Sequence, residues 1–442
     1  MTEAVTPEAR PAYSNRYIAM AMLLLLAVNT VNFMDRQVIN ILAEPIKHDL
    51  GLADWQLGAM SGLAFAFLYT TMGLPIARLA ERRSRPLIIA SCIIVWSGFT
   101  AVCGTANSFL QLVLARVGVG IGEAGCTPAA SALIADMVPK HRRASAMAFF
   151  TMAAPLGGVV GLGLGGVAAD AMGWRMTFVV VGLLGIPLGI LTALFLREPR
   201  RGMTSAESIA SGAPSFTETM AFLRRKKTFW LVTAATAGKV FVGYGHAAFV
   251  ASFLLRNHTA QIAEIAAQFN LKPVGLVGIA LALTTGPANM ISALVGGWLA
   301  DRFGRKDPRA YPTVPAVAML FQLPFYVPAF LVGNFWLALA LLTANALVSS
   351  AYYGTTYAMV QGVTKPQMRA TATALFAMIT TLVGLGFGPL VVGLMSDTLA
   401  GAGGLGSGPG LKWALVLSLS FYPLVFFGFW RARKTIVAEM ED

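Results

Sequence analysis

Long apolar stretches alternate with short polar connections along almost the whole chain. A membrane-spanning helix needs about 20 mostly apolar residues. Twelve stretches reach this length: 17–42, 56–78, 86–106, 108–135, 145–169, 173–196, 228–255, 273–300, 312–332, 335–360, 370–396 and 411–431. The pattern predicts an all-α polytopic membrane protein with twelve transmembrane helices.

The longest polar connection, residues 197–227, separates the sixth stretch from the seventh and ends in the basic run 224–227. We expect an N-terminal six-helix bundle over 1–196, a cytoplasmic linker over 197–227 and a C-terminal six-helix bundle over 228–442.

The two halves repeat each other. Residues 79–85 match 299–305 at an offset of 220, and 143–150 match 369–376 at an offset of 226. The matches fall at equivalent places in the topology, which indicates a duplicated unit. Pseudo-symmetric six-helix bundles that rock about a central site are the architecture typical of such a duplication.

Composition and charge support a membrane location. The chain is 56% hydrophobic and 12% charged, whereas soluble domains carry about 25% charged residues. If both termini are cytoplasmic, most of the 33 Lys and Arg lie in inner loops and tails, as the positive-inside rule requires. The net charge of +13 then needs no nucleic acid to explain it. We expect an integral multi-pass protein, in the inner membrane if the chain is bacterial.

Few ionisable residues fall inside the predicted spans, and each costs several kcal/mol unless it is paired or hydrated. At 1.5 Å per residue, Asp35 in the first span and Arg116 in the fourth reach about the same depth. Glu123 lies two turns beyond Arg116 on the same face, and Asn32 lies one turn before Asp35. We predict an acid–base column of Asp35, Arg116 and Glu123.

This column is our candidate for proton coupling. Pairing with Arg116 keeps Asp35 ionised, and loss of that partner allows Asp35 to bind a proton. Glu123 is either a second acceptor or a partner for Arg116. The alternative is a static pair that joins two helices. The repeat places Leu342 and Ser349 opposite Arg116 and Glu123, so the second half lacks the pair and the fold does not require it.

Other polar and aromatic residues in the spans are candidates for substrate binding. Arg36 points about 100° from Asp35 and is expected to meet lipid headgroups or the outer loops. Lys239 and His246 share a face of the seventh span and could bind an anionic headgroup; snorkelling of the lysine and a satisfied core histidine are the alternatives. Tyr352 and Tyr353 could contact an acyl chain, or simply pack. The candidate set is Asn32, Arg36, Lys239, His246, Tyr352 and Tyr353.

Acidic and basic residues also meet at the inner ends of the second and eighth spans. Glu81 and Arg82, with Asp301 and Arg302, could cap neighbouring helices and bridge the halves. We expect a conformational latch there; a surface charge cluster that only sets topology is the alternative.

The loop after the eighth span, Gly297-Trp298-Leu299-Ala300-Asp301-Arg302-Phe303-Gly304-Arg305-Lys306, resembles the loop signature of the major facilitator superfamily. The first-half copy is degenerate. Within that superfamily, Val31-Asn32-Phe33-Met34-Asp35-Arg36 and Gly120-Ile121-Gly122-Glu123-Ala124 resemble the Spinster family. This resemblance implies proton-linked transport of lysolipids or sphingosine phosphate.

Cofactor chemistry has no signal in the chain. Two G-x-G-x-x-G matches, at 120–125 and 161–166, lie inside spans rather than after a strand, so they indicate close helix packing and not a nucleotide site. We expect no catalytic residue, no metal, no cofactor and no nucleic-acid partner. The expected partners are protons, membrane lipids and a small lipid-like substrate, and we expect a monomer.

Together these features predict a secondary active transporter that works by alternating access, is coupled to protons and moves an amphipathic anionic lipid such as a lysolipid or sphingoid phosphate. A carrier for a soluble organic anion or a drug is the first alternative. An integral membrane enzyme is the alternative of another class, but the chain offers no catalytic constellation for it.

Overall fold

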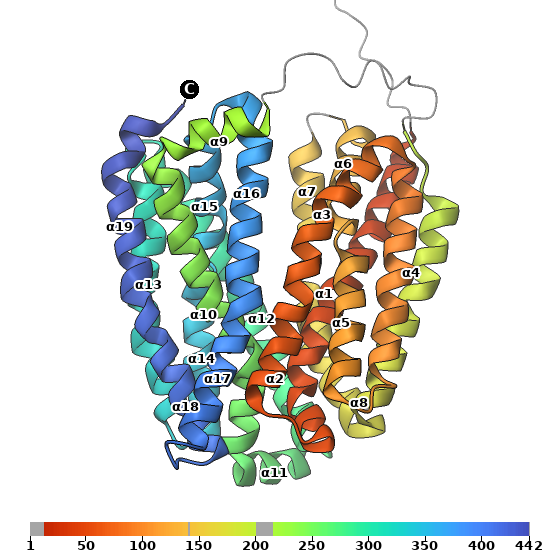
Figure 1. Ribbon diagram of the computed structural model, residues 1–442, viewed down its shortest axis with the longest axis vertical. Helices are drawn as coiled ribbons and strands as arrows, with labels where there is room; N and C mark the ends of the chain where they lie inside the picture. Colours follow the sequence, from red (N-terminus) through yellow and green to blue (C-terminus); the bar gives the residue numbers. More distant parts are fainter. Residues whose placement is uncertain (1–12, 140–141, 200–214, 442) are drawn as a thin grey trace, which may run out of the picture.

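The computed structural model describes residues 13–139, 142–199 and 215–441, without the side chains at positions 74, 77, 81, 82 and 144. Every regular element in these ranges is a helix (Figure 1). The chain is therefore an all-α polytopic membrane protein, as the apolar pattern predicts. Helices satisfy their backbone hydrogen bonds internally, which a segment inside a bilayer must do.

We call residues 13–199 the N-half and residues 215–441 the C-half. The N-half contains α1 (Asn15–Leu50), α2 (Asp54–Gly58), η1 (Ala59–Leu63), α3 (Ala64–Arg82), α4 (Arg85–Cys103), α5 (Phe109–Glu123), α6 (Cys126–Met137), α7 (Arg143–Thr151) and α8 (Ala153–Phe195). The C-half contains α9 (Phe216–Arg224), α10 (Lys227–Asn257), α11 (Thr259–Gln268), α12 (Pro273–Gly304), α13 (Ala310–Leu331), α14 (Phe335–Ser349), α15 (Tyr352–Gly362), η3 (Pro366–Met368), α16 (Arg369–Thr381), η4 (Leu382–Phe387), α17 (Gly388–Ala400), α18 (Ser407–Ser418), η5 (Leu419–Phe421) and α19 (Tyr422–Glu439).

Eleven helices in the described residues are long and apolar enough to cross a membrane, one fewer than the twelve predicted stretches. The difference lies in Ser145–Phe195, a single helical stretch of 51 residues. At 1.5 Å per residue it is about 75 Å long, more than twice the hydrocarbon thickness of a bilayer. Gly173, with φ 79° and ψ 163°, interrupts the helical backbone inside α8. The chain therefore turns there and crosses twice, so the predicted fifth and sixth spans are joined by a bend instead of a loop.

Two short helices lie where only connections were predicted. α9 lies in the predicted linker and begins with a capping box, in which Ser215 accepts from the N–H of Glu218 and the Glu218 carboxylate accepts from the N–H of Ser215. α11 lies between the seventh and eighth predicted spans. Residues 200–214 of the predicted linker lie outside the described residues.

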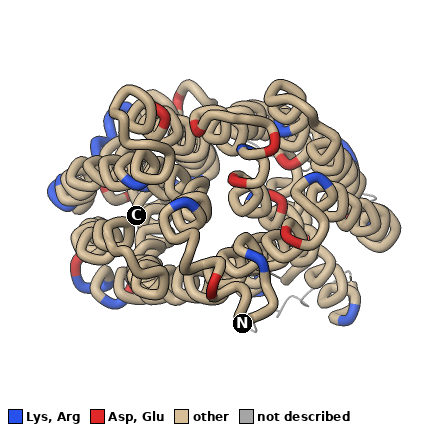
Figure 2. Tube along the Cα trace, turned by 90° about the horizontal axis from the view of Figure 1, so that it is seen from below, with Lys and Arg blue, Asp and Glu red and all other residues tan. Residues whose placement is uncertain are grey.

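The two halves stand side by side with their helices roughly parallel (Figure 1). We call the end with α9 and the C-terminal end of α19 the linker side, and the end with α11 the far side. Every hydrogen bond and ion pair found between the halves, within the described ranges, lies on the far side. Seen from that side, several acidic and basic positions lie around the middle of the molecule, where the halves meet (Figure 2). The structure is therefore closed on the far side.

Candidate functional site

The N-half buries the ion pair that the depth argument predicted. Arg116 Nη1 of α5 lies 3.3 Å from Asp35 Oδ2 of α1, and both residues are 1% exposed. The hydroxyl of Thr100, in α4, donates to Asp35 Oδ1 at 2.9 Å. Three helices thus converge on one carboxylate, which has a cation on one oxygen and a neutral donor on the other.

A second buried pair lies beside the first and corrects two expectations. Arg36 does not reach lipid headgroups or an outer loop: its Nε lies 2.6 Å from Glu123 Oε2. Glu123 accordingly pairs with Arg36 and not with Arg116. The turn from Asp35 to Arg36 along α1 directs Arg36 toward the C-terminal end of α5, where Glu123 is the last helical residue before α6 begins at Cys126.

An aromatic ring joins the two pairs. The Phe65 centroid lies 4.9 Å from Arg36 Cζ and 5.4 Å from Arg116 Cζ, and Tyr69 lies 4.6 Å from Arg36 Cζ. Cation–π contacts of this kind strengthen in a desolvated site. Asn32, which precedes both α1 residues by one turn, is 1% exposed, and its amide makes no hydrogen bond with the described protein atoms. The column therefore contains two ion pairs and one polar side chain without a hydrogen-bond partner among the described residues.

Neutralising one member of the second pair is expected to destabilise the fold more than neutralising both. Glu123→Gln or Arg36→Gln leaves a charge without its partner, which costs about 3–5 kcal/mol at a buried site, while the double variant leaves no charge. Thermal unfolding of the four proteins in detergent measures this. Additive losses in the double variant would contradict a tight pair.

A cavity of about 360 Å³ lies between the halves. The N-half lines it with Gln37 of α1 and with small or apolar residues of α8, and the C-half lines it from α10, α12, α13 and α14. The polar groups are few: Gln37, Lys239, Thr285, Asn289, Tyr326, Asn345 and Ser349. A concave, mostly apolar site with few convergent polar groups is typical of a small-molecule pocket.

Lys239 is the one charged residue among those lining this cavity. Its Nζ donates to Gln322 Oε1 at 2.9 Å, to Tyr422 Oη at 3.0 Å and to Ser349 Oγ at 3.1 Å. The residue is 2% exposed. No ion pair of Lys239 occurs among the described residues, so neutral acceptors alone satisfy it. The alternative of snorkelling is therefore wrong for this side chain.

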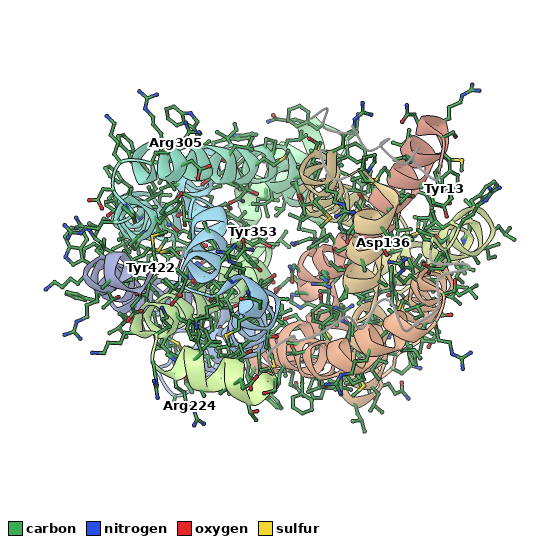
Figure 3. All side chains as sticks on the ribbon, turned by 90° about the horizontal axis from the view of Figure 1, so that it is seen from above. Tyr13, Asp136, Arg224, Arg305, Tyr353 and Tyr422 are labelled. Carbon is green, nitrogen blue, oxygen red and sulfur yellow. The ribbon has the colours of Figure 1, made fainter. Side chains whose placement is uncertain are left out.

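The other substrate-binding candidates are more dispersed. His246 does not line the cavity: its Nε2 lies 2.7 Å from Ser418 Oγ, and its ring packs on Tyr326 and Phe330. The Tyr352 ring lies 5.8 Å from Lys239 Nζ. Tyr353 is 57% exposed and lies on the face of the C-half turned toward the N-half (Figure 3).

The predicted latch residues make no bridge between the halves in the part of the chain that is described. Tyr311, one helix along, donates to Asp301 at 3.5 Å, and Arg302 lies over the Trp298 ring of its own helix. The side chains of Glu81 and Arg82 lie outside the described residues. The latch stays a prediction.

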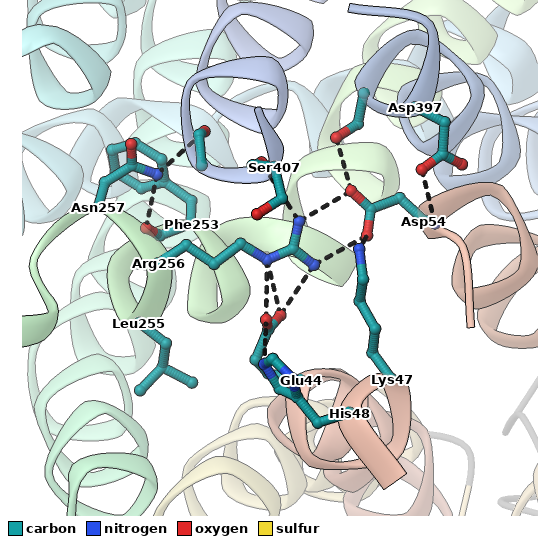
Figure 4. A network of polar contacts seen from close by, with 12 residues as sticks. Glu44, Lys47, His48, Asp54, Phe253, Leu255, Arg256, Asn257, Asp397 and Ser407 are labelled. Carbon is teal, nitrogen blue, oxygen red and sulfur yellow. Dashed lines mark hydrogen bonds and ion pairs between the residues drawn. The ribbon is translucent and has the colours of Figure 1, made fainter. Parts of the chain in front are cut away.

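The strongest cluster between the halves was missed by sequence reasoning. Arg256, at the end of α10, donates to Glu44 of α1 at 2.9 Å and to Asp54 of α2 at 2.8 Å (Figure 4). Lys47 lies 2.5 Å from Asp54, and Ser396 of α17 donates to Asp54 at 2.6 Å. The signal was present, because Lys47 and Arg256 both fall in predicted outer connections with carboxylates nearby along the chain. We call Glu44, Lys47, Asp54, Arg256 and Ser396 the far-side cluster.

Two sets of spanning helices, with ion pairs buried among them and a cavity lined by both, define a membrane transporter and not an enzyme. The chain belongs to the major facilitator superfamily, because the Major Facilitator Superfamily model matches residues 25–389.

Individual relatives agree with this assignment. An MFS-type efflux pump of Mycolicibacterium smegmatis is 34% identical, over 94% of this chain and 93% of that protein. The sphingosine-1-phosphate transporter SPNS2 of Danio rerio is 26% identical, over 84% of this chain and 74% of that protein. A crystal structure of a bacterial homologue of the human lysosomal transporter Spinster, inward-facing and unoccupied, matches with a TM-score of 0.87 and 30% identity, over 97% of this chain and 100% of that chain. The predicted resemblance to Spinster proteins is confirmed.

Proposed function

We propose that the protein is a proton-coupled secondary active transporter that moves an amphipathic anion, such as a lysolipid or a sphingoid phosphate, by alternating access. The observation that carries this proposal is the buried amino group of Lys239. It is buried beside an apolar cavity with three neutral acceptors and no ion-pair partner among the described residues. An isolated buried ammonium is costly, and an anionic ligand would offset that cost.

The internal repeat also favours an anionic ligand. In the N-half, Arg36 of the first span pairs with Glu123 of the fourth span. In the C-half, Lys239 of the corresponding first span reaches Ser349, which the 226-residue offset places opposite Glu123. The cation of the N-half thus has a carboxylate at this position, whereas Lys239 has a hydroxyl there and only neutral acceptors among the described residues. An anionic headgroup would supply the negative charge that the C-half lacks at the position of Ser349.

The remaining lining favours an apolar body on the same ligand. Small residues of α8 and α12, among them Ala154, Gly158, Ala282 and Gly286, leave room beside Lys239. Tyr352 and the exposed Tyr353 extend the aromatic surface around the lysine toward the N-half. An acyl or sphingoid chain suits such a surface better than a sugar does.

Proton coupling would arise in the column of the N-half. In the structure Arg116 and Thr100 bind the two oxygens of the Asp35 carboxyl group. A proton on Asp35 removes the attraction to Arg116, so the guanidinium can turn to another acceptor and α1 can move relative to α5. Arg36 and Glu123, joined to this pair through Phe65, would transmit the change to the wall of the cavity.

A carrier for a drug or a soluble organic anion is the second candidate. The 34% identity to an MFS-type efflux pump favours it. Such a carrier would use the same cavity, but the apolar body of its ligand would be compact instead of chain-like.

A substrate panel in proteoliposomes with an imposed pH gradient separates these candidates. We expect gradient-driven movement of a sphingoid phosphate and of lysophosphatidic acid. Glycerol 3-phosphate, which has the headgroup without the chain, should not move. Transport of galactonate or of a cationic dye, without transport of either lipid, would overturn the lipid assignment.

A further inference from the structure

On the far side, a carboxylate of the C-half accepts hydrogen bonds from the first backbone N–H groups of an N-half helix. Asp397 of α17 accepts from Asp54 N at 3.0 Å and from Trp55 N at 2.7 Å. These N–H groups begin α2, which continues through η1 and α3 as one span. The N-cap residue of α2 is Ala53, whose side chain has no acceptor, so the cap comes from the opposite half.

The reverse contact joins the same two halves at another pair of helices. Asp170 of α8, in the N-half, accepts from Gly275 N of α12 at 2.5 Å. The N-cap residue of α12, Lys272, provides no side-chain cap and instead donates from Nζ to the carbonyl oxygen of Asp170 at 2.6 Å. The N-terminus of α12 is therefore capped by the N-half, as that of α2 is capped by the C-half.

The internal repeat relates these two caps. Asp397 follows Asp170 by 227 positions, and Gly275 follows Trp55 by 220. The same offsets, within one residue, relate the repeated segments of the two halves. In the repeat, the acceptor of one cap thus corresponds to the acceptor of the other, and the donor of one to the donor of the other.

A glycine one turn before each aspartate completes the match. A Cβ at Gly166 would clash with the carbonyl oxygen of Val274, and a Cβ at Gly393 would clash with that of Asp54. Gly393 follows Gly166 by 227 positions, and Val274 follows Asp54 by 220. Each half therefore contributes a G-x-x-x-D segment, in which the glycine admits the opposite helix and the aspartate caps it.

We propose that Asp170 and Asp397 are a matched pair of positioning residues that close the far side of the transporter by capping one helix of the opposite half each. The proposal rests on alternating access, since the caps can form only while the far side is closed. When that side opens, water can take over the released N–H groups, so opening does not leave them unpaired.

The two caps differ in what surrounds them. The cap on α2 adjoins the far-side cluster, where Arg256 binds both Glu44 and Asp54 across the halves (Figure 4). Among the described residues, the only other polar contact of the cap on α12, besides those of the Asp170 carboxylate, is that of Lys272 with a carbonyl oxygen. Loss of Asp170 should therefore open the far side more than loss of Asp397.

Distances between spin labels on the two halves test this proposal without substrate or gradient. Labels replace four exposed residues: Asn107, between α4 and α5, and Glu264 of α11 on the far side, and Arg142, just before α7, and Arg224, at the end of α9, on the linker side (Figure 1). Asp170→Ala, Asp397→Ala and the double variant are compared with the parent. Asp49→Ala is the matched control, because Asp49 binds Trp174 and Arg175 within the N-half on the same side.

We expect the far-side distance to lengthen and the linker-side distance to shorten, most in the double variant, then in Asp170→Ala, then in Asp397→Ala, with no change in Asp49→Ala. Unchanged far-side distances in the double variant would overturn the proposal. Broadening at both label pairs would indicate unfolding; Asp170→Leu with Asp397→Leu, which keep about the same side-chain size but have no acceptor, then decide by the same criterion. A failed lipid panel with a positive label result would overturn only the substrate assignment.

Discussion

Replacing Asp35 by Asn is expected to abolish transport driven by a pH gradient. The amide is nearly the size of the carboxylate and can still accept from Thr100, but it cannot take up or release a proton. Uptake of the transported lipid into proteoliposomes with and without an imposed gradient measures the effect, and the gradient-driven part should fall to that of empty liposomes. Glu264→Gln, the same chemical change on an exposed face of α11, is the control.

The variant also leaves Arg116 buried without its carboxylate, which should lower the unfolding temperature. A double variant, Asp35→Asn with Arg116→Gln, removes both charges and should recover stability. If the pair only joins two helices, the double variant should recover transport as well. If Asp35 carries the proton, it should recover stability alone. Gradient-driven uptake by the double variant would therefore contradict a coupling role.

Replacing Lys239 by Met is expected to abolish transport of anionic lipids while stabilising the fold. The substitution removes a buried amino group that has no ion-pair partner among the described residues, and Tyr422 can keep its own hydrogen bond to Gln322, which is 3.1 Å long. A buried ammonium without an ion-pair partner is costly, so an apolar side chain of similar volume should raise the unfolding temperature. A gain in thermal stability together with a loss of function would mark Lys239 as a residue kept for its ligand.

Thermal unfolding and lipid uptake, measured on the same preparations, test this expectation. Lys434→Met, at an exposed position of α19, is the control and should alter neither property. A stable Lys239→Met variant that transports a sphingoid phosphate at the parental rate would remove the lysine from the site.

The spans and the duplicated halves could be predicted because they depend on apolar length and on internal similarity, which are both properties of the sequence itself. Apolar length determines where a helix can cross, and the repeat shows which segments correspond. The pairing of Asp35 with Arg116 was accessible for the same reason, since depth along a straight helix needs only the rise per residue.

The partners of Arg36 and Lys239 could not be obtained in this way. Arg36 meets Glu123 because of how α1 and α5 are rotated about their axes, and periodicity does not specify rotation relative to a neighbour. Lys239 contacts Gln322 and Tyr422, which lie on two helices far from it along the chain. Neither residue carries a charge that a search for ionisable groups would find.

The sequence did not predict the caps that each half places on a helix of the other half, for a third reason. Their donors are backbone N–H groups, which every residue except proline has, so no residue type marks them. The matched positions of Asp170 and Asp397 in the repeat are the only indication in the sequence. Their meaning is clear only from the structure, in which α2 and α12 each contact the opposite half.

In the proposed mechanism two buried side chains have separate roles: Asp35 exchanges the proton, and Lys239 binds the anion. Proton exchange on addition of a sphingoid phosphate to purified protein, in weakly buffered solution with a pH indicator, tests this division most directly. We predict that the parent exchanges protons on binding, that Asp35→Asn binds the lipid without exchange, and that Lys239→Met does neither. An Asp35→Asn variant that binds the lipid and exchanges as many protons as the parent would contradict the account.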